Sequence, residues 1–331
     1  MRVLLVCDHV YPIAKTNGAG KKPILSPSGA GCHQFDLLAN GLSEKGHDVS
    51  YLVHHLPGTS SPEGVELIDA PIEDVDIVHL KTCSFPEVIA HYQSMGIPVF
   101  ATNHAYIPEM TPTCEWMYVS KTLANLYGKT QYIWNGLDPK EYIYSSKKED
   151  YFLFMADMTR HIPKGLDIAL KLSKDLNFRL IVAGTAKEQE DIDKVQQMCD
   201  EYGAEYIGDI DGVQKAKVLT NARALISPSR LPESFGMTLA EALLSGTPVI
   251  CSNVGAYGEI VPSEVGFVCD DESDYHHAIK NIDSIDNEKC RSYALQSFDY
   301  LNTTEKYIEF YKQMIIKSQT EKSLEHLTSS K

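Results

Sequence analysis

The stretch Ser227–Cys251, which reads SPSRLPESFGMTLAEALLSGTPVIC, decides the fold of this chain. The apolar residues before it predict a buried strand, which the polar and proline-containing turn around Ser229 ends. The mostly apolar segment 237–244 predicts a helix that is buried on most of its surface, and Gly246 and Pro248 stop that helix. The apolar residues after Pro248 predict a second strand, so the stretch is a strand–helix–strand unit.

Two carboxylates interrupt this apolar stretch: Glu233 lies in the turn and Glu241 lies inside the helix. Because the helix begins near Gly236, its first amides have no intrahelical partner, and together with the helix dipole they form an anion site that suits phosphate. These are the amides of Phe235, Gly236, Met237 and Thr238. Glu241 lies about 7 Å farther along the helix axis, about the reach from a bound diphosphate to a ribose. Glu233 lies on the opposite side of the diphosphate from Glu241 and therefore faces the group that is attached to the diphosphate there.

Residues 233–242, Glu-Ser-Phe-Gly-Met-Thr-Leu-Ala-Glu-Ala, followed by Gly246-Thr-Pro-Val-Ile, resemble the E-x7-E signature of retaining glycosyltransferases of the GT4 type. The resemblance extends over nearly the whole chain. It implies a nucleotide-diphospho-sugar donor, with Glu233 orienting the hydroxyls of the donor sugar and Glu241 binding the ribose. The remaining residues that this motif assigns to the donor are Ser234, Phe235, Gly236, Met237 and Thr238. The alternative is a purely structural strand–helix–strand unit with a chance pair of acids.

The resemblance also implies an α/β fold of the GT-B class, in which two Rossmann-like, doubly wound parallel-sheet domains face each other across a cleft. A length of 331 residues suits two domains. We expect an acceptor-side domain at residues 1–140 and a nucleotide-sugar-binding domain at residues 141–300. Residues 301–331 are expected to be closing helices that cross back to the first domain, ending in a polar, frayed tail from Ser318.

The first domain carries two features of the family. A glycine-bearing turn ends in Gly29-Ala30-Gly31 and opens a predicted helix. The family has a Gly-Gly pair there for approach to the donor diphosphate, and since Ala30 replaces one glycine, the contact is assigned to Gly29 or Gly31. His104 follows the apolar strand 98–102 and matches a family histidine near the transferred sugar. The alternatives are a capping or core histidine and, for the turn, a nicotinamide site, although G-x-G-x-x-G is absent.

The second domain has to supply cations, because negative charge builds on the leaving diphosphate when the sugar–phosphate bond breaks. Lys164-Gly165 matches a Lys-Gly pair that holds the diphosphate in the family. The family arginine that precedes it is replaced by Asp157, so Arg160 is predicted to substitute for it, unless Arg160 is an ordinary surface residue. Gly184, at the end of the apolar strand 180–183, is assigned to the donor as well.

The composition of the chain argues against several other classes of protein. The net charge of −15 argues against a general polyanion-binding surface. The eight cysteines are scattered with no C-x-x-C pair, which favours buried, reduced thiols over a disulfide framework or a zinc site. We find no signal peptide and no apolar run near the roughly 20 residues of a membrane span. The expectation is a soluble, cytoplasmic protein, with peripheral membrane association left open.

The sequence predicts a hexosyl- or pentosyltransferase that uses a UDP- or GDP-sugar, retains the anomeric configuration and needs no metal or other cofactor, since no D-x-D motif lies in a suitable turn. A nucleotide-sugar epimerase, a phosphorylase, a non-catalytic sugar-nucleotide-binding protein and a dehydrogenase remain as alternatives. The acceptor is open among a glycan, a lipid-linked sugar, a small molecule and a nucleic acid. Lys15, Lys21 and Lys22 either contact an anionic group of the acceptor or belong to a solvated loop.

Overall fold

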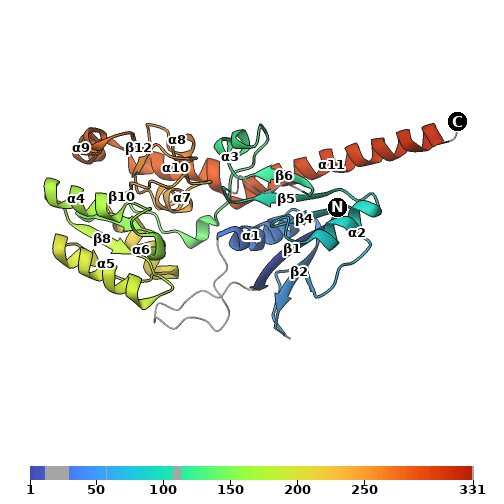
Figure 1. The fold of residues 1–331 in the computed structure, drawn as a ribbon, viewed down its shortest axis with the longest axis horizontal. Helices are drawn as coiled ribbons and strands as arrows, with labels where there is room; N and C mark the ends of the chain where they lie inside the picture. Colours follow the sequence, from blue (N-terminus) through green and yellow to red (C-terminus); the bar gives the residue numbers. More distant parts are fainter. Residues whose placement is uncertain (12–29, 57, 107–112, 330–331) are drawn as a thin grey trace. The chain divides into compact units, whose positions relative to one another are not determined.

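The structure is a computed structural model that describes residues 1–11, 30–56, 58–106 and 113–329. The described chain divides into two compact units. The first holds the residues up to Leu137 together with those from Tyr300 onward, and the second holds Asp138–Asp299. Each unit contains one six-stranded sheet with helices around it (Figure 1). The predicted α/β class with two similar halves is confirmed.

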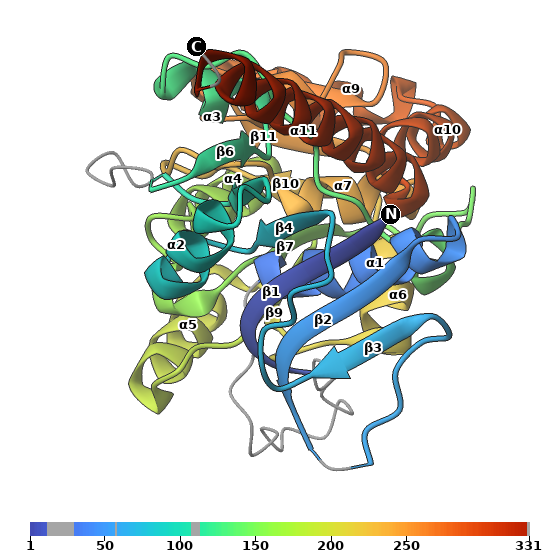
Figure 2. The same cartoon turned by 90° about the vertical axis from the view of Figure 1, so that its right-hand side faces the viewer.

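The first sheet is entirely parallel and has the order β3-β2-β1-β4-β5-β6. Figure 2 shows β1, β2 and β3 side by side. Strands buried on both faces read as continuous apolar runs, and residues 3–6 of β1 are such a run. The strands are β1 (Arg2–Tyr11), β2 (Asp48–His55), β3 (Val65–Ile68), β4 (Ile77–Leu80), β5 (Val99–Asn103) and β6 (Glu115–Tyr118).

Helices α1 and α11 pack on one face of this sheet, where Leu5 of β1, Phe35 of α1 and Tyr311 of α11 share one apolar core. The start of α11 rests on Gly136, because a Cβ at that glycine would lie 2.6 Å from the Cα of Tyr300. The helices of the first unit are α1 (Ala30–Glu44), α2 (Pro86–Ser94), α3 (Lys121–Leu126) and α11 (Tyr300–Ser329).

The second sheet is also parallel, in the order β12-β11-β10-β7-β8-β9. Its central strands β7 and β10 are fully apolar except for the last residue of β10, Ser227. The order reverses between β10 and β7, which makes this the topological switch point of the unit. The strands are β7 (Phe152–Met155), β8 (Leu180–Ala183), β9 (Glu205–Tyr206), β10 (Ala224–Ser227), β11 (Val249–Ser252) and β12 (Gly266–Cys269).

Helices cover both faces of the second sheet. Residues of α4, α5 and α9 share one core with β7 and β8. Helix α7 packs against α10, and between them the rings of Phe235 and Phe298 meet edge to face at 5.7 Å. The helices are α4 (Leu166–Leu176), α5 (Gln189–Tyr202), α6 (Gly212–Asn221), α7 (Met237–Leu244), α8 (Tyr257–Ile260), α9 (Glu272–Asn281) and α10 (Asn287–Phe298), with short 3-10 turns η1 (Pro139–Glu141), η2 (Met158–Arg160) and η3 (Ile282–Ser284).

The structure differs from the sequence prediction at the margins. The edge strands β3 and β6 were not predicted, because each contains a glutamate and lacks the continuous apolar run that marks buried four-residue strands such as β8. The prediction that the chain frays from Ser318 onward is wrong, because α11 continues as a helix to Ser329. Ser318 and Lys322 donate to the backbone oxygens of Gly96 and Met95, which holds this polar part of the helix on the first unit.

Some sequence assignments lie outside the described residues: Gly29 and the lysines Lys15, Lys21 and Lys22. Within the described residues, no helix combines the length and the apolar composition needed to cross a bilayer.

Candidate active site

The candidate site lies at the switch point of the second sheet. Two turns leave the carboxyl ends of the neighbouring strands β7 and β10: residues 156–165 after β7 and residues 228–236 after β10. Ligands of open parallel sheets bind at the carboxyl ends of strands, where the strand order reverses. These two turns are therefore where ligand-binding side chains are expected.

An ion pair between Lys164 and Glu233 joins the two turns. Lys164 Nζ donates to Glu233 Oε1, and Ser229 Oγ donates to the same oxygen over 3.2 Å. The side chains of Lys164 and Glu233 are each 17% exposed, so the pair is mostly shielded from water. The structure thus brings together two residues that the sequence assigned separately to the diphosphate and to the sugar.

Two glycines bring other backbone segments against the Glu233 turn: Gly255, in the turn after β11, and Gly165, at the end of the Lys164 turn. Gly255 has φ 56°, and a Cβ there would lie 2.3 Å from the carbonyl oxygen of Glu233. The same oxygen accepts a hydrogen bond from the amide of Ala256. Gly165 has φ 85°, and its Cβ would lie 2.0 Å from the carbonyl oxygen of Pro228. Only glycine combines this left-handed conformation with so close an approach, so both positions fix the geometry of the ion pair.

The start of α7 follows Glu233 directly. Gly236 caps the helix with φ 111°, and a Cβ there would lie 2.8 Å from the ring of Tyr257. Phe235 is buried in the core, so its amide, and not its ring, is the part that a ligand can meet. Ser234, Met237 and Thr238 are half-buried. The positive end of the helix dipole therefore lies one turn of chain from Glu233.

Glu241 is buried in the middle of α7, where two donors converge on its Oε1. Lys215 Nζ, from α6, lies at 2.8 Å, and the hydroxyl of Tyr142 lies at 3.1 Å. Burial by itself lowers the pKa of Lys215, but the Glu241 carboxylate outweighs burial and raises it above the ordinary value. Burial, and then Glu241, raise the pKa of Tyr142. Among the described residues no donor bonds Oε2, so this fixed carboxylate keeps one oxygen for a ligand.

Arg160 and Arg230 both lie near the site, but Arg230 is held by more hydrogen bonds than Arg160. Arg160 is 55% exposed, and its Nε donates over 3.3 Å to Asp157, the acid at the position of the family arginine. Arg230 is bound by both guanidinium nitrogens to the carboxylate of Asp167, at 2.8 and 2.7 Å, and also donates to the carbonyl oxygen of Ile162. The hydrogen bonds from Arg230 lower the pKa of Asp167. Arg230 thus ties the Glu233 turn to the start of α4 through Asp167 and to the turn that carries Lys164 through Ile162.

A family profile described as "Glycosyl transferases group 1" matches residues 140–296, which make up nearly all of the second unit. The chain is 28% identical over 291 residues to an uncharacterised glycosyltransferase of Methanocaldococcus jannaschii, covering 78% of this chain and 82% of the relative. It is 27% identical over 179 residues to an O-antigen chain mannosyltransferase of Salmonella typhimurium, about half of each chain.

The crystal structure of a glycosyltransferase involved in avilamycin A biosynthesis has the same fold, with a TM-score of 0.71 over 95% of this chain and 98% of the other, at 23% identity. Profile, relatives and fold agree. Residues 140–296 belong to the group 1 glycosyltransferases. Its two sheets are the two halves of the GT-B architecture.

In this glycosyltransferase, Gly184 closes the carboxyl end of β8. It has φ 140°, and a Cβ there would lie 1.9 Å from the carbonyl oxygen of Ala156, at the end of β7. Its amide donates to Gly208 and its carbonyl accepts from the hydroxyl of Tyr206. The glycine assigned to the donor is thus required by the backbone, since no side chain fits between the two strand ends.

His104 of the glycosyltransferase belongs to the first unit, at the carboxyl end of β5. Burial, and then the positive charge of Lys81, lower the pKa of His104 to about 4. Gly31 faces the ring closely, because a Cβ at Gly31 would lie 3.2 Å from His104 Cδ2. The imidazole is therefore neutral at physiological pH and offers a hydrogen bond without a charge. His79, in the neighbouring strand β4, is by contrast a core residue bonded to Thr102 and Tyr311.

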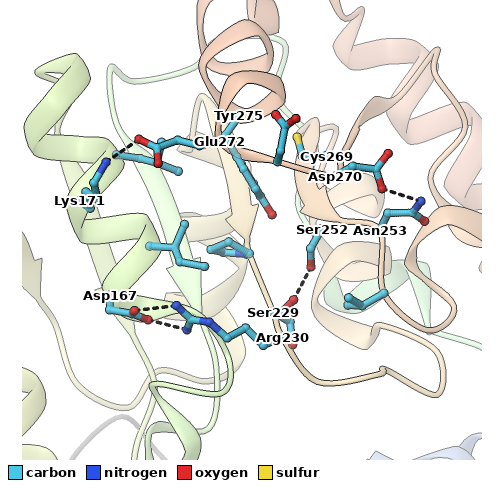
Figure 3. Close-up of a pocket in the computed structure, with 15 residues that line it drawn as sticks. Asp167, Lys171, Ser229, Arg230, Ser252, Asn253, Cys269, Asp270, Glu272 and Tyr275 are labelled. Carbon is cyan, nitrogen blue, oxygen red and sulfur yellow. Dashed lines mark hydrogen bonds and ion pairs between the residues drawn. The ribbon is translucent and has the colours of Figure 1, made fainter.

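A cavity of about 460 Å³ lies on the second unit beside the Glu233 turn (Figure 3). Figure 3 shows the Arg230–Asp167 pair on one side of it and Tyr275 on the other, with Ser229 and Ser252 linked by a hydrogen bond at its wall. None of the residues assigned to the donor lines this cavity. Ser229, whose hydroxyl reaches Glu233, and the Arg230–Asp167 pair belong both to the wall of this cavity and to the surroundings of the ion pair.

Sequence reasoning missed four residues that organise the site of this glycosyltransferase: Tyr142, Lys215, Arg230 and Gly255. Arg230 was visible inside the opening stretch, and its position three residues before Glu233 was a usable signal. The other three act through contacts between distant segments, such as the 99 residues that separate Tyr142 from Glu241.

Proposed function

We propose that this protein transfers a sugar from a nucleotide-diphospho-sugar to an acceptor hydroxyl, with retention at the anomeric carbon and without a metal ion at the reacting centre. The observation that carries this proposal is the Lys164–Glu233 pair at the switch point, next to the start of α7. A cation, a helix amino terminus and a carboxylate meet there, which suits a diphosphate with a sugar attached to it.

Lys164 has the central role in the chemistry. As the sugar–phosphate bond breaks, negative charge grows on the diphosphate, and a lysine held in a mostly dry site stabilises that charge strongly. The first amides of α7 add their dipoles. Before the donor arrives, Glu233 holds Lys164 in place, and afterwards we expect the Glu233 carboxylate to orient sugar hydroxyls. Arg160 as a further ligand of the diphosphate stays a prediction.

Glu241 is proposed to bind the ribose. Lys215 and Tyr142 fix its Oε1, so that Oε2 can accept a hydrogen bond from a ribose hydroxyl with little loss of side-chain entropy. A hexosyl donor fits the name of the Salmonella relative, a mannosyltransferase, and we propose UDP or GDP as the nucleotide. We propose a cytoplasmic site of action, and a hydroxyl of a glycan or a lipid-linked sugar as the acceptor.

A thermal-shift screen with UDP-, GDP-, ADP- and TDP-sugars tests donor binding. A sugar nucleotide at a hundred times its Kd adds about 2.7 kcal/mol to the free energy of unfolding, which is readily measured. The Glu241→Gln variant should lose most of the shift for the same donor. No shift with any sugar nucleotide would contradict the proposal.

Turnover separates the competing reactions. With a donor alone, an epimerase forms a new nucleotide-sugar and a binding protein forms nothing, whereas a transferase forms a glycoside only when an acceptor is added. Proton NMR of the glycoside gives the anomeric configuration, and an inverted product would refute retention. The rate should not change when Mg²⁺ and Mn²⁺ are omitted.

A further inference from the structure

A cluster of metal-ligating side chains lies in the first unit, whereas Lys164, Glu233 and Glu241 of the proposal above belong to the second unit. Cys7 and His9 lie on β1, and Cys32 lies in the first turn of α1. One ligand atom from each residue lies within 4.8 Å of the other two, and all three residues are buried. We propose that Cys7, His9 and Cys32 bind a zinc ion.

The backbone brings the ligands to one place. Cys7 and His9 are two residues apart on a strand, so their side chains leave on the same face. The pairing of β1 with β2 shifts register between Val6 and Val10, and such irregularities re-aim side chains next to sites. His9 Nδ1 lies 3.1 Å from Cys7 Sγ. Tetrahedral zinc places sulfur and nitrogen ligands about 3.5–3.8 Å apart, so a small outward movement suffices.

The second ring nitrogen of His9 is already fixed. Nε2 lies 2.9 Å from Asp36 Oδ1, which also accepts a hydrogen bond from the buried hydroxyl of Tyr51 at 2.8 Å. When Nε2 donates its proton to Asp36, the lone pair is on Nδ1, the nitrogen that faces Cys7. A carboxylate behind a ligating histidine is the usual outer partner in zinc sites, and it sets both the tautomer and the orientation of the ring. Asp36 is therefore a positioning residue.

The charges and the ligand types select the ion. Two thiolates neutralise Zn²⁺, and sulfur with imidazole favours zinc over magnesium or calcium, which prefer oxygen. Lys81 Nζ lies 3.4 Å from Cys32 Sγ, and its own charge is balanced by its ion pair with Asp8. Three protein ligands leave a fourth position for water.

The site would have a structural consequence. Cys32 directly follows Gly31, the residue that faces the ring of His104. A metal ion that joins β1 to the first turn of α1 would therefore hold Gly31 against His104. The metal is part of the fold of the first unit and takes no part in the sugar transfer.

Metal content tests the proposal. The full chain is purified under reducing conditions with Cys83→Ser and Cys114→Ser, because the sulfur atoms of that other thiol pair lie 3.6 Å apart and offer a competing site. We expect one zinc ion per chain by elemental mass spectrometry. When Co²⁺ replaces zinc, thiolate-to-cobalt charge-transfer bands and the d–d bands of a tetrahedral ion are expected.

The variants Cys7→Ser, Cys32→Ser and His9→Gln should each lose these bands and the stoichiometric zinc. Cys199→Ser, which removes a buried thiol in the second unit, is the matched control and should keep both. If circular dichroism shows that one variant is unfolded, the other two decide. Absence of stoichiometric zinc in the parent chain, or full cobalt bands in Cys32→Ser and His9→Gln, would overturn the proposal. A Cys7–Cys32 disulfide formed in the presence of zinc would overturn it as well.

Discussion

Replacing Lys164 by methionine tests the central assignment, because it removes the charge and keeps most of the side-chain volume. If Lys164 stabilises the leaving diphosphate, the loss appears in the transition state more than in donor binding. Removal of one preorganised donor from such a site typically lowers kcat about 10²–10³-fold. We therefore expect Lys164→Met to lower kcat by about that factor, with a smaller change in the Kd of the donor.

The same substitution has a separate effect on stability. It leaves the Glu233 carboxylate without its cation in a position that is 17% exposed. The expected loss is about 2 kcal/mol, between the values for exposed and for fully buried ion pairs. For a chain of 331 residues this corresponds to a fall of about 3 °C in Tm, since the unfolding entropy is about 2.1 cal/mol/K per residue. The double variant Lys164→Met/Glu233→Gln should recover most of the Tm, since no unpaired charge remains, and none of the rate.

Initial rates with saturating donor and thermal melts of the same preparations separate the two effects. Lys194→Met is the matched control, because its ammonium pairs with Glu190 on the exposed face of α5, and both rate and Tm should stay close to those of the parent. A Lys164→Met enzyme with kcat within threefold of the parent would refute the catalytic assignment. A double variant no more stable than Lys164→Met would refute the account of the ion pair.

Three further predictions concern other parts of the molecule. Gly255→Ala places a Cβ 2.3 Å from a backbone oxygen and should lower the free energy of unfolding by about 2–4 kcal/mol, whereas Gly203→Ala, at a similar φ with open space around it, should cost only about 1 kcal/mol in urea titrations. Lys215→Met frees the carboxylate of Glu241 and should weaken the donor Kd about tenfold by calorimetry, with kcat little changed; an unaltered Kd would count against the ribose assignment. Because burial holds the pKa of His104 near 4 against 6.5 in the unfolded chain, stability should fall as the pH drops through that interval, by about 2.5 kcal/mol between pH 7 and 4.5. His104→Gln should lose this part of the acid sensitivity, and an unchanged pH slope in denaturant titrations would contradict it.

Much of the second unit was predictable because its signals are local. The apolar segment 237–244 and its glycine stop predicted α7, and the motif that contains Glu233 and Glu241 predicted which two carboxylates contact the donor. Lys164 was predicted from a short motif that follows a strand. These signals depend on hydrogen bonding and side-chain direction within about two helical turns, which is the range over which sequence patterns report structure.

The partners of those residues were not predictable in the same way. Lys215 and Glu241 lie on different helices, and Tyr142 comes from the segment before β7. The chain has 30 basic residues, and no pattern says which of them meets a given acid. Arg160 illustrates the difficulty, since the structure pairs it with Asp157, whereas the bidentate contact of Arg230 was not foreseen.

By itself the sequence determined the class of fold and the helix that carries the E-x7-E motif, and it predicted roles for two glutamates and one lysine. Only the tertiary structure decided how these groups are held. It joined Lys164 to Glu233, fixed Glu241 between Lys215 and Tyr142, and gathered Cys7, His9 and Cys32, which the spacing of the cysteines did not suggest. The physical reason is that periodicity encodes which face of an element is buried, whereas the convergence of polar side chains depends on how distant elements pack against one another.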